Sequence, residues 1–452
     1  MKLKHFKASG VHGYLEFDLQ LHEHLTFLVG PNGSGKSTAL ALLEALITPS
    51  LRELALLEFK EAAINFEDSG VKSITVQRTE EFLSISASWI EKPLEIRNLS
   101  SEHREIFTND QEAAEEYFAN LTLELSANAV FRAISDIAAP VFLGIERQHK
   151  KDLRVGAVGN ALAGGRSAHS IRVGAAARRL MRGNLAAGLQ DTQLIVQEAY
   201  RNARRAVDSF QEKLRADVLL SAFKYTDIER TAPNIFYGDI NTSNFQKLDK
   251  SRDEITEALS NLGIPSDLVN ERVGEFFNKL SGLSSRMDAI GKGSSGSEDA
   301  ILEFLTNRGH VERLQSLISL VQDFKNKSDK SFKRINQFCS SLGLFYEDSG
   351  KKISLDQIGR IVVTRSDGRD ISLDSLSSGE RQLVIIFAHI FFNTYGTRSR
   401  VFVIDEPELS LHLRWQEMLV ERLTQASPET QFVFATHSPE IVGEFKNRCV
   451  QV

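Results

Sequence analysis

The sequence has little cysteine and no long apolar run. Its two cysteines, Cys339 and Cys449, lie far apart among 452 residues, so they form neither a disulfide framework nor a recognisable metal-binding pattern. Such sparse cysteine fits a reducing compartment. No uninterrupted apolar stretch has the roughly eighteen residues of a membrane span, and polar residues break the first twenty positions where a signal peptide would lie. We therefore expect a cytoplasmic protein with no membrane partner.

A strong net charge is also lacking. The formal charge of −6 gives no overall attraction to nucleic acid, so any contact with DNA or RNA needs a local patch. One glycine- and alanine-rich stretch has nine basic residues and only Asp152 as a counter-charge. It is either a contact for phosphate backbones or a solvated, partner-facing loop, since few aromatic residues are interleaved for base stacking. These residues are Arg147, Lys150, Lys151, Arg154, Arg166, Arg172, Arg178, Arg179 and Arg182.

Strand and helix patterns are present at both ends of the chain. Leu25–Val29 reads as a short apolar strand, followed by a glycine-rich turn and a helical pattern from Lys36 to Ile47. The last hundred residues alternate between helix and strand, which predicts a parallel sheet covered by helices. The expected elements are a helix at 379–395, a strand at 400–404, a helix at 413–425 and a strand at 431–435.

The middle of the chain differs from its ends. Helical patterns cover about 192–222 and 301–342, and a flexible polar connector, Gly291–Ser297, precedes the second. We therefore predict an α/β fold in which residues 1–150 and 343–452 form two halves of one head. Residues 151–342 then form an inserted region with the basic loop and a short helical hairpin or lid.

The turn after the first apolar strand carries a phosphate-binding pattern. Gly30, Pro31, Asn32, Gly33, Ser34, Gly35, Lys36, Ser37 and Thr38 fit G-x-x-x-x-G-K-[ST]. The glycines let backbone N–H groups turn toward phosphates, and the helix that follows directs its positive dipole end at them. Lys36 would reach the terminal phosphates of ATP, and the Ser37 hydroxyl would bind Mg²⁺. A plain glycine turn is the alternative, and the complete pattern between strand and helix disfavours it.

Two adjacent carboxylates end a second apolar strand. Asp405 and Glu406 follow four apolar residues, Val401–Ile404, at the carboxyl end of a strand, where α/β sheets bind ligands. Asp405 is placed to hold the Mg²⁺ shell, and Glu406 to orient or deprotonate the attacking water. Upstream, Leu376–Gln382 opens a helix in which Ser378 is expected to act as N-cap and Gly379 to permit close approach.

Taken together, these motifs resemble those of ATP-binding-cassette proteins. The Glu-Arg-Gln ending at Glu380–Gln382 and the run Asp405–His412 are similar to the non-transporter branch, with its structural-maintenance-of-chromosomes, RecF-like and overcoming-lysogenization-defect ATPases. The resemblance covers roughly the first 150 and the last 110 residues. It implies that Ser377, Ser378, Gly379 and Glu380 of one subunit contact the ATP bound by another. ATP then joins two subunits, and its hydrolysis releases them.

The same resemblance implies further site residues. His437 matches a switch histidine that senses the γ-phosphate, and Ser410–His412 a loop that crosses between monomers, although Leu413 stands where relatives often have proline. Lys7 matches a basic residue near the nucleotide. A glutamine that binds Mg²⁺ is expected, with Gln148 preferred to Gln77 because it follows an expected strand at 141–145.

The resemblance also suggests a biological role. Compact ATPases of this branch resemble the ATPase subunits of bacterial anti-phage systems such as Septu and the phage-anti-restriction-induced system. Fifteen residues follow His437, too few for the nuclease domain of overcoming-lysogenization-defect enzymes, so we expect a separate effector protein. The leading hypothesis is a homo-oligomeric ATPase that senses a phage cue and controls that effector. The alternative is a RecF-like repair ATPase that binds DNA directly, and the large insertion disfavours a transporter ATPase.

Overall fold

The computed structural model describes residues 1–138, 140–144, 185–221, 266–291, 298–392 and 400–452, with Arg252 and Thr256 between them. Gln148 and the basic stretch from Arg147 to Arg182 lie outside these residues. The chain divides into two compact units. One consists of Met1–Ala199 and Ile335–Val452, and the other of Tyr200–Arg334. The head is therefore built from both ends of the chain.

A five-stranded parallel sheet forms the centre of the head, with strand order β14-β3-β13-β12-β8. Its strands come from both ends of the sequence, as predicted, and all five residues of β13 are buried. Burial on both faces is what a parallel sheet requires, and it explains the continuous apolar runs in the sequence. The strands are β3 (Leu25–Val29), β8 (Val141–Leu143), β12 (Val401–Asp405), β13 (Gln431–Ala435) and β14 (Cys449–Gln451).

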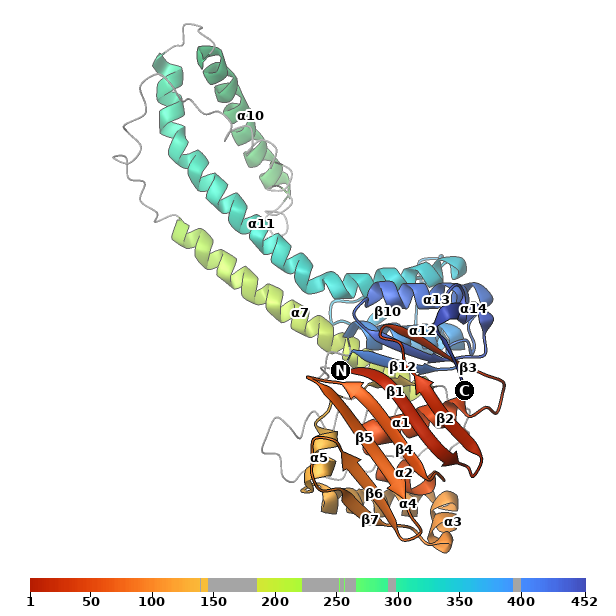
Figure 1. Ribbon diagram of the computed structural model, residues 1–452. Coiled ribbons are helices and arrows are strands. Elements are labelled where there is room, and N and C mark those ends of the chain that lie inside the picture. Colours follow the sequence, from red (N-terminus) through yellow and green to blue (C-terminus); the bar gives the residue numbers. More distant parts are fainter. Residues whose placement is uncertain are drawn as a thin grey trace. The chain divides into compact units, whose positions relative to one another are not determined.

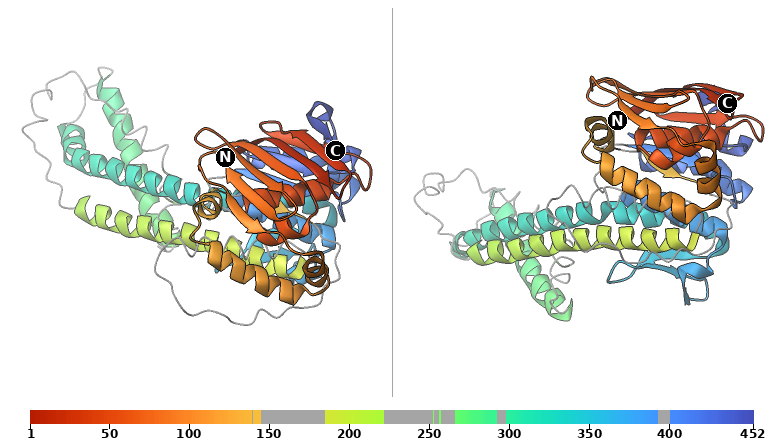
Figure 2. Two further views of the ribbon diagram at one scale, coloured as in Figure 1. Left: turned by 60° about the horizontal axis from the view of Figure 1, so that its bottom comes forward. Right: turned by 90° about the horizontal axis from the view of Figure 1, so that it is seen from below.

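A second, antiparallel sheet has the strand order β2-β1-β4-β5-β6-β7. Helices lie along one face of it (Figures 1 and 2), and among them α1 (Lys36–Ile47) contacts β4, β5 and the parallel strand β12. The helix lies between the two sheets, and eight of its twelve residues are buried. Its nearly continuous apolar sequence reflects this burial. The strands are β1 (Lys2–Val11), β2 (Leu15–Gln20), β4 (Glu61–Glu67), β5 (Val71–Arg78), β6 (Phe82–Ala87) and β7 (Leu94–Arg97).

One buried side chain connects the two sheets. Gln431, the first residue of β13, accepts a hydrogen bond of 2.7 Å from the backbone N–H of Leu3 through Oε1. Its Nε2 donates to the carbonyls of Leu3 and His22 at 2.7 and 2.8 Å. The amide is thus fully used at a position from which water is excluded, as buried polar groups require.

Short elements complete the head. A three-stranded sheet, β11-β10-β9, precedes the C-terminal helices. The remaining elements are α2 (Leu51–Leu56), α3 (Ser101–Asn109), α4 (Gln111–Leu125), α5 (Ala129–Ser135), β9 (Lys352–Leu355), β10 (Ile361–Thr364), β11 (Asp370–Ile371), α12 (Ser378–Phe392), α13 (Leu413–Ala426) and α14 (Pro439–Val442), with short 3-10 turns η2 (Glu347–Ser349), η3 (Leu373–Ser375) and η4 (Lys446–Arg448).

The second unit is helical wherever it is described. It contains α10 (Ser266–Gly291) and parts of two longer helices, α7 (Leu185–Ser221) and α11 (Glu298–Tyr346). The ring of Tyr200 lies 5.7 Å from that of Phe332, and Lys327 lies 6.0 Å from the Phe210 ring. Position increases along α7 as it decreases along α11, so the two helices run antiparallel, as the predicted hairpin requires. Among the helices of the described residues, none is apolar over enough length to cross a bilayer.

Candidate functional site

The phosphate loop, Gly30–Gly35, joins β3 to α1 at the carboxyl end of the parallel sheet. Gly35 has φ of 94°, a left-handed conformation that favours glycine, and no side chain caps the helix that begins there. A Cβ at Gly35 would lie 2.9 Å from the Phe17 ring. The first N–H groups of α1 therefore receive no side-chain cap, which leaves them available to an anion. Pro31, Asn32 and Gly33 are exposed at the tip of the loop, and Thr38 is half-buried.

Lys36, the first residue of α1, is buried, and its side chain folds back over this loop. Its Nζ donates to the carbonyls of Gly30 and Pro31 at 2.9 and 3.2 Å, and it lies 3.3 Å from Nδ1 of His437. Burial lowers the pKa of Lys36, and the nearby carboxylates of Asp405, Glu406 and Glu408 oppose that shift. The two motifs that contribute Lys36 and His437 lie about four hundred positions apart in the sequence and meet here, while the role of His437 as a sensor of the γ-phosphate stays a prediction.

Asp405 ends β12 beside the first turn of α1. Burial raises the pKa of its carboxyl group, while a hydrogen bond from Ser37 opposes that shift. One carboxylate oxygen, Oδ1, is buried and has no hydrogen-bond partner within the described part of the chain. A buried oxygen without a partner beside a serine hydroxyl is a donor set that fits Mg²⁺, which prefers oxygen ligands.

The strand that precedes Gln148 ends next to this aspartate. β8 pairs with β12 in parallel, with Leu143 opposite Ile404, and a Cβ on Gly144 would lie 3.9 Å from the Asp405 Cβ. The described end of β8 therefore lies beside Asp405. The alternative glutamine, Gln77, donates to Glu61 at 3.2 Å within the antiparallel sheet. Assignment of the Mg²⁺-binding glutamine stays a prediction, with Gln148 still preferred.

Glu406 and Ser410 adopt backbone conformations that are unusual for residues with a side chain. Their φ angles are 48° and 65°, and such angles cost about 1 kcal/mol or more unless the surroundings impose them. The N–H of Glu406 donates to the Ala435 carbonyl at 2.8 Å, which continues the pairing of β12 with β13. Glu406 thus directly follows the end of β12 at Asp405, and its role as the base for the attacking water stays a prediction.

Glu408 is a site residue that the sequence reasoning missed. Its Oε2 accepts from the Thr436 hydroxyl at 2.8 Å, and its Oε1 accepts from the backbone N–H of His437 at 2.7 Å. Glu408 thereby fixes the loop that presents the histidine. The only sequence signal was a third acidic residue after the strand, and its partners, twenty-eight and twenty-nine positions later, become evident only when β12 and β13 are paired.

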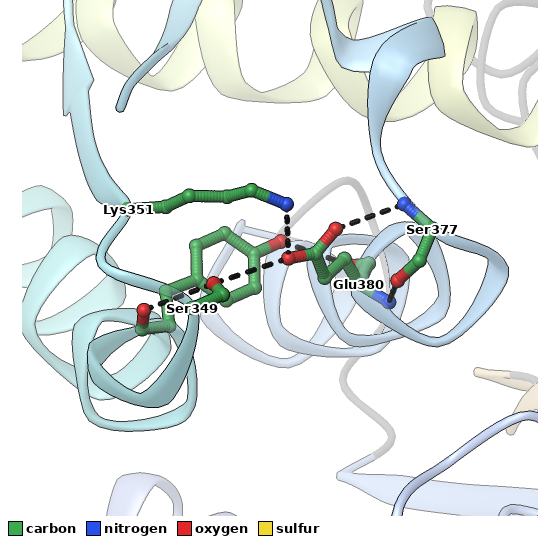
Figure 3. A network of polar contacts seen from close by, with 5 residues as sticks. Ser349, Lys351, Ser377 and Glu380 are labelled. Atoms are coloured by element: carbon green, nitrogen blue, oxygen red, sulfur yellow. Dashed lines mark hydrogen bonds and ion pairs between the residues drawn. The ribbon is translucent and has the colours of Figure 1, made fainter. Parts of the chain in front are cut away.

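The signature turn begins one residue earlier than predicted. Ser377, rather than Ser378, caps α12, because its Oγ accepts from the N–H of Glu380 at 3.2 Å and the Glu380 carboxylate accepts from the Ser377 N–H at 2.8 Å (Figure 3). This reciprocal pair is a capping box. Ser378 is the first helical residue. The prediction that Ser378 is the N-cap is therefore wrong, since the glutamate at the third helical position selects the earlier serine.

Gly379 packs against the loop that was predicted to cross between monomers. A Cβ on Gly379 would lie 2.3 Å from the Ser410 carbonyl oxygen, so only glycine fits. Gln382 strengthens the same contact by donating to the Pro407 carbonyl at 3.1 Å. Leu413 is the first residue of α13, a position that also suits proline, so the departure from the family pattern leaves the helix start intact.

Lys7 lies on β1 and is exposed, opposite Asp18 of β2. The pKa of the Asp18 carboxyl is lowered, chiefly by a hydrogen bond with His5 and to a smaller extent by the charge of Lys7. A role of Lys7 beside the nucleotide stays a prediction.

The parallel sheet, the phosphate loop and the paired carboxylates define a P-loop ATPase head of the ATP-binding-cassette type. A family model described as "AAA domain, putative AbiEii toxin, Type IV TA system" matches residues 204–443, which is more than half of the chain. The chain belongs to this family. A second model, described as "AAA ATPase domain", matches residues 1–140.

Curated relatives match parts of the chain. The Retron Vc95 probable ATPase of Vibrio cholerae serotype O1 biovar El Tor is 26% identical over 198 residues, 39% of this chain and 38% of the relative. Endonuclease GajA of Bacillus cereus (strain VD045) is 23% identical over 158 residues, 34% of this chain and 27% of that enzyme. The chromosome partition protein Smc of Methanocaldococcus jannaschii is 25% identical over 38% of this chain and 16% of its own length. The matches thus span well under half of each relative.

Solved structures with a related arrangement include two Smc head domains. The Pyrococcus furiosus head with an extended coiled coil, bound to the C-terminal domain of ScpA, aligns with a TM-score of 0.39 and 12% identity, over 100% of this chain and 93% of that one. The head from Thermotoga maritima aligns with a TM-score of 0.36 and 12% identity, over 98% and 91%.

Proposed function

We propose that this protein binds ATP with Mg²⁺ and hydrolyses it in sites that two copies of the chain complete together. The observation that carries the proposal is the buried Oδ1 of Asp405, which lacks a hydrogen-bond partner in the described structure beside the Ser37 hydroxyl and the buried Lys36. A cation there would satisfy the oxygen, and the triphosphate would replace the carbonyls that now accept from Lys36.

Each residue has a distinct task in this proposal. The N–H groups of the loop and the Lys36 ammonium bind the β- and γ-phosphates, and Ser37 and Asp405 hold the metal ion. When bound, Mg²⁺ neutralises charge on the phosphate oxygens. Glu406 orients the attacking water and accepts its proton, while His437 lies beside Lys36 to sense the γ-phosphate.

The second copy supplies the signature turn. Within its own chain, the Ser377 hydroxyl accepts from the Glu380 N–H, and the Glu380 carboxylate accepts from the Ser377 N–H, Ser349 and Lys351. Gly379 packs against the Ser410 carbonyl. These contacts hold the turn rigid in its own chain, which suits a surface that docks on a nucleotide held elsewhere. The N-terminus of α12 would then direct its N–H groups at the partner's γ-phosphate.

A trapping experiment tests the proposal. Glu406→Gln should retain ATP binding, slow hydrolysis on the order of a hundredfold or more, and shift the protein to a dimer when ATP and Mg²⁺ are added. Sedimentation velocity and phosphate release measure the two effects, with Lys36→Ala as the control that should remain unshifted. ATP binding without any change in sedimentation would contradict the shared sites.

We further propose that the ATPase belongs to an anti-phage defence complex and controls a separate effector. Support comes from the family, whose description includes a toxin, and from partial similarity to a retron ATPase and an endonuclease. Co-expression with each protein encoded nearby, followed by affinity purification and phage plating, tests this role. If no neighbour co-purifies and the plating efficiency of phage is unchanged, the defence role is wrong while the ATPase proposal stands.

The basic stretch favours one alternative, direct DNA binding by a RecF-like ATPase. Salt-dependent DNA binding with ATP would then be lost when Arg178 and Arg179 are changed to Ala. Binding that is absent in the unaltered protein would remove this alternative.

A further inference from the structure

The signature turn of α12 is held by residues that come before it in the sequence, at the junction of α11 and β9. Tyr346, the last residue of α11, donates from its hydroxyl to the Glu380 carbonyl at 3.0 Å. Ser349 donates to Oε1 of Glu380 at 3.3 Å, and Lys351 forms an ion pair with the same oxygen at 2.6 Å. Figure 3 shows Ser349 and Lys351 converging on the carboxylate from one side, with Ser377 on the other.

Glu380 is an unusual place for a charge, because its side chain is only 3% exposed. A buried carboxylate is unfavourable unless cations and donors surround it. Burial alone would raise the pKa of Glu380, but the hydrogen bonds from Lys351 and from the Ser377 N–H bring it below its ordinary value. The carboxylate therefore stays ionised and remains available to accept the hydrogen bond from the Ser377 N–H.

The capping contact depends on this ion pair. Oε1 of Glu380 accepts from Lys351 and Ser349, while Oε2 accepts from the Ser377 N–H. Holding one oxygen fixes the rotamer that places the other against the turn. If Lys351 lost its charge, the buried carboxylate would either take up a proton or rotate toward water, and both changes weaken its bond to Ser377.

We propose that Lys351 and Tyr346 are positioning residues for ATP hydrolysis, which fix the signature turn in the geometry that engages the partner's triphosphate. This inference rests on the proposed function, since it requires the turn to act on ATP bound by a second copy. In this proposal Tyr346 and Lys351 act on the nucleotide only through Glu380. A fixed turn lowers the entropy lost when two copies close on ATP, so its loss affects closure and turnover rather than nucleotide binding at the phosphate loop.

The test replaces each contact while sparing the phosphate loop. Lys351→Met removes the charge at similar length, and Tyr346→Phe removes only the hydroxyl. The control is Lys352→Met, the same change at the next residue, which is exposed on β9. Lys351→Arg is the conservative variant that keeps a cation. Three readouts are measured on the full chain: binding of a fluorescent ATP analogue to monomers, steady-state kcat and KM, and ATP-induced dimerisation in the Glu406→Gln background.

We expect Lys351→Met to lower kcat and weaken dimerisation on the order of tenfold, the rate equivalent of one charge-assisted hydrogen bond. Tyr346→Phe should lower kcat and weaken dimerisation by only a few-fold. Nucleotide binding by monomers should be unchanged in both variants. Lys352→Met should match the unaltered protein. Lys351→Arg should recover most of the lost kcat, because the cation beside Glu380 is restored.

Several results would overturn the inference. One is a Lys351→Met protein that equals Lys352→Met in kcat and dimerisation, and another is a loss confined to monomer nucleotide binding. Should Lys351→Met fail to fold, Tyr346→Phe decides, and unchanged turnover and dimerisation in that variant would disprove the positioning role. If the Glu406→Gln protein itself does not dimerise with ATP, the proposed shared site fails first, which separates the two proposals.

Discussion

Two helices of the head, α1 and α12, begin at the phosphate loop and at the signature turn, and their N-termini are built in opposite ways. At α1 the N-cap is Gly35, and no side chain caps the helix. At α12 a complete capping box closes the turn, and Ser349, Lys351 and Tyr346 secure it further. The first helix therefore leaves donors available, whereas at the second the capping box satisfies the N–H groups of Ser377 and Glu380 within their own chain.

The two N-termini also differ in whether nearby buried polar side chains have hydrogen-bond partners. The Ser34 hydroxyl, in the loop before α1, is buried without a hydrogen-bond partner, and so is Oδ1 of Asp405, as far as the described structure shows. Unsatisfied buried groups cost free energy that a ligand can return. The side chains of Ser377 and Glu380 in the turn at α12 both have partners in their own chain, so under the proposed function this turn acts through its shape and the orientation of its free N–H groups. We call the phosphate loop with Asp405 the incomplete site, because the Ser34 hydroxyl and Oδ1 of Asp405 lack partners there among the described residues. We call the signature turn the finished surface, because the side chains of Ser377 and Glu380 have partners.

The largest expected effect comes from removing the central donor of the incomplete site. Lys36→Ala should abolish detectable ATP hydrolysis, because the triphosphate loses the cation that binds its terminal oxygens. ATP with Mg²⁺ at a hundredfold excess over Kd should stabilise the unaltered protein by about 2.7 kcal/mol, and this gain should vanish in the variant. Thermal unfolding with and without nucleotide measures it. The variant without nucleotide should unfold at no lower temperature, since a buried, desolvated ammonium has been removed.

The central elements of the head could be predicted from the sequence. The strand at Leu25–Val29, the helix at Lys36–Ile47 and the strand at Gln431–Ala435 were predicted at their observed bounds, because short apolar runs with glycine or proline nearby define their own limits. The pairing of strands from both chain ends followed from helix–strand alternation. Local patterns with strong physical causes were therefore sufficient for the centre of the head.

Long-range contacts could not be predicted in this way. The pairing of β1 with β4 in the antiparallel sheet was not predicted, because the alternating residues of a half-exposed strand do not identify the strand that it pairs with. The pairing of β14 with β3 in the parallel sheet was not predicted either. Glu408 and Lys351 carry no motif of their own, and their roles appear only where the loops meet. The choice of Ser377 over Ser378 as N-cap depended on the three-residue spacing to Glu380, which the sequence does contain.

A second prediction concerns the oxygen without a partner. Asp405→Asn should reduce hydrolysis on the order of a hundredfold, because the amide is a poor Mg²⁺ ligand and metal ions contribute several kcal/mol to such reactions. The same change should raise stability in the absence of nucleotide, since it removes a buried charge. Urea unfolding in chelator and phosphate release in Mg²⁺ measure the two opposite effects. A variant that is both inactive and less stable would contradict the idea of an incomplete site.

The pH dependence of Asp405 gives this prediction a sign. Burial raises the pKa of its carboxyl in the folded state. Between the ordinary pKa of an aspartate and the raised one, the folded chain binds more protons than the unfolded chain, so stability falls as pH rises through that window. Above the window the unfavourable contribution is constant. Without Mg²⁺, the unfolding free energy of the Asp405→Asn protein should not show this part of the decrease with rising pH.

A third prediction addresses the finished surface. Gly379→Ala would place a methyl group 2.3 Å from the Ser410 carbonyl oxygen, which must move. We expect a loss of about 1–3 kcal/mol in unfolding free energy, as for other overpacked sites. Gly343→Ala is the matched control, because it is also a helical glycine but has nothing within 4 Å of the added methyl. That control should gain about 0.5–1 kcal/mol from helix propensity. Equal effects at both glycines would show that the contact with Ser410 is unimportant.

The smallest expected effect separates the two serines of the signature turn. Ser377→Ala removes the side chain that caps α12 and should cost about 1 kcal/mol of stability, while Ser378→Ala, at the first helical position, should change it by less than about 0.5 kcal/mol. Both are measured by urea unfolding without nucleotide, so that no contact with ATP contributes. Because the two residues are adjacent and identical, the comparison isolates the cap. A larger loss at Ser378 would mean that α12 begins one residue later, and that Glu380 caps nothing.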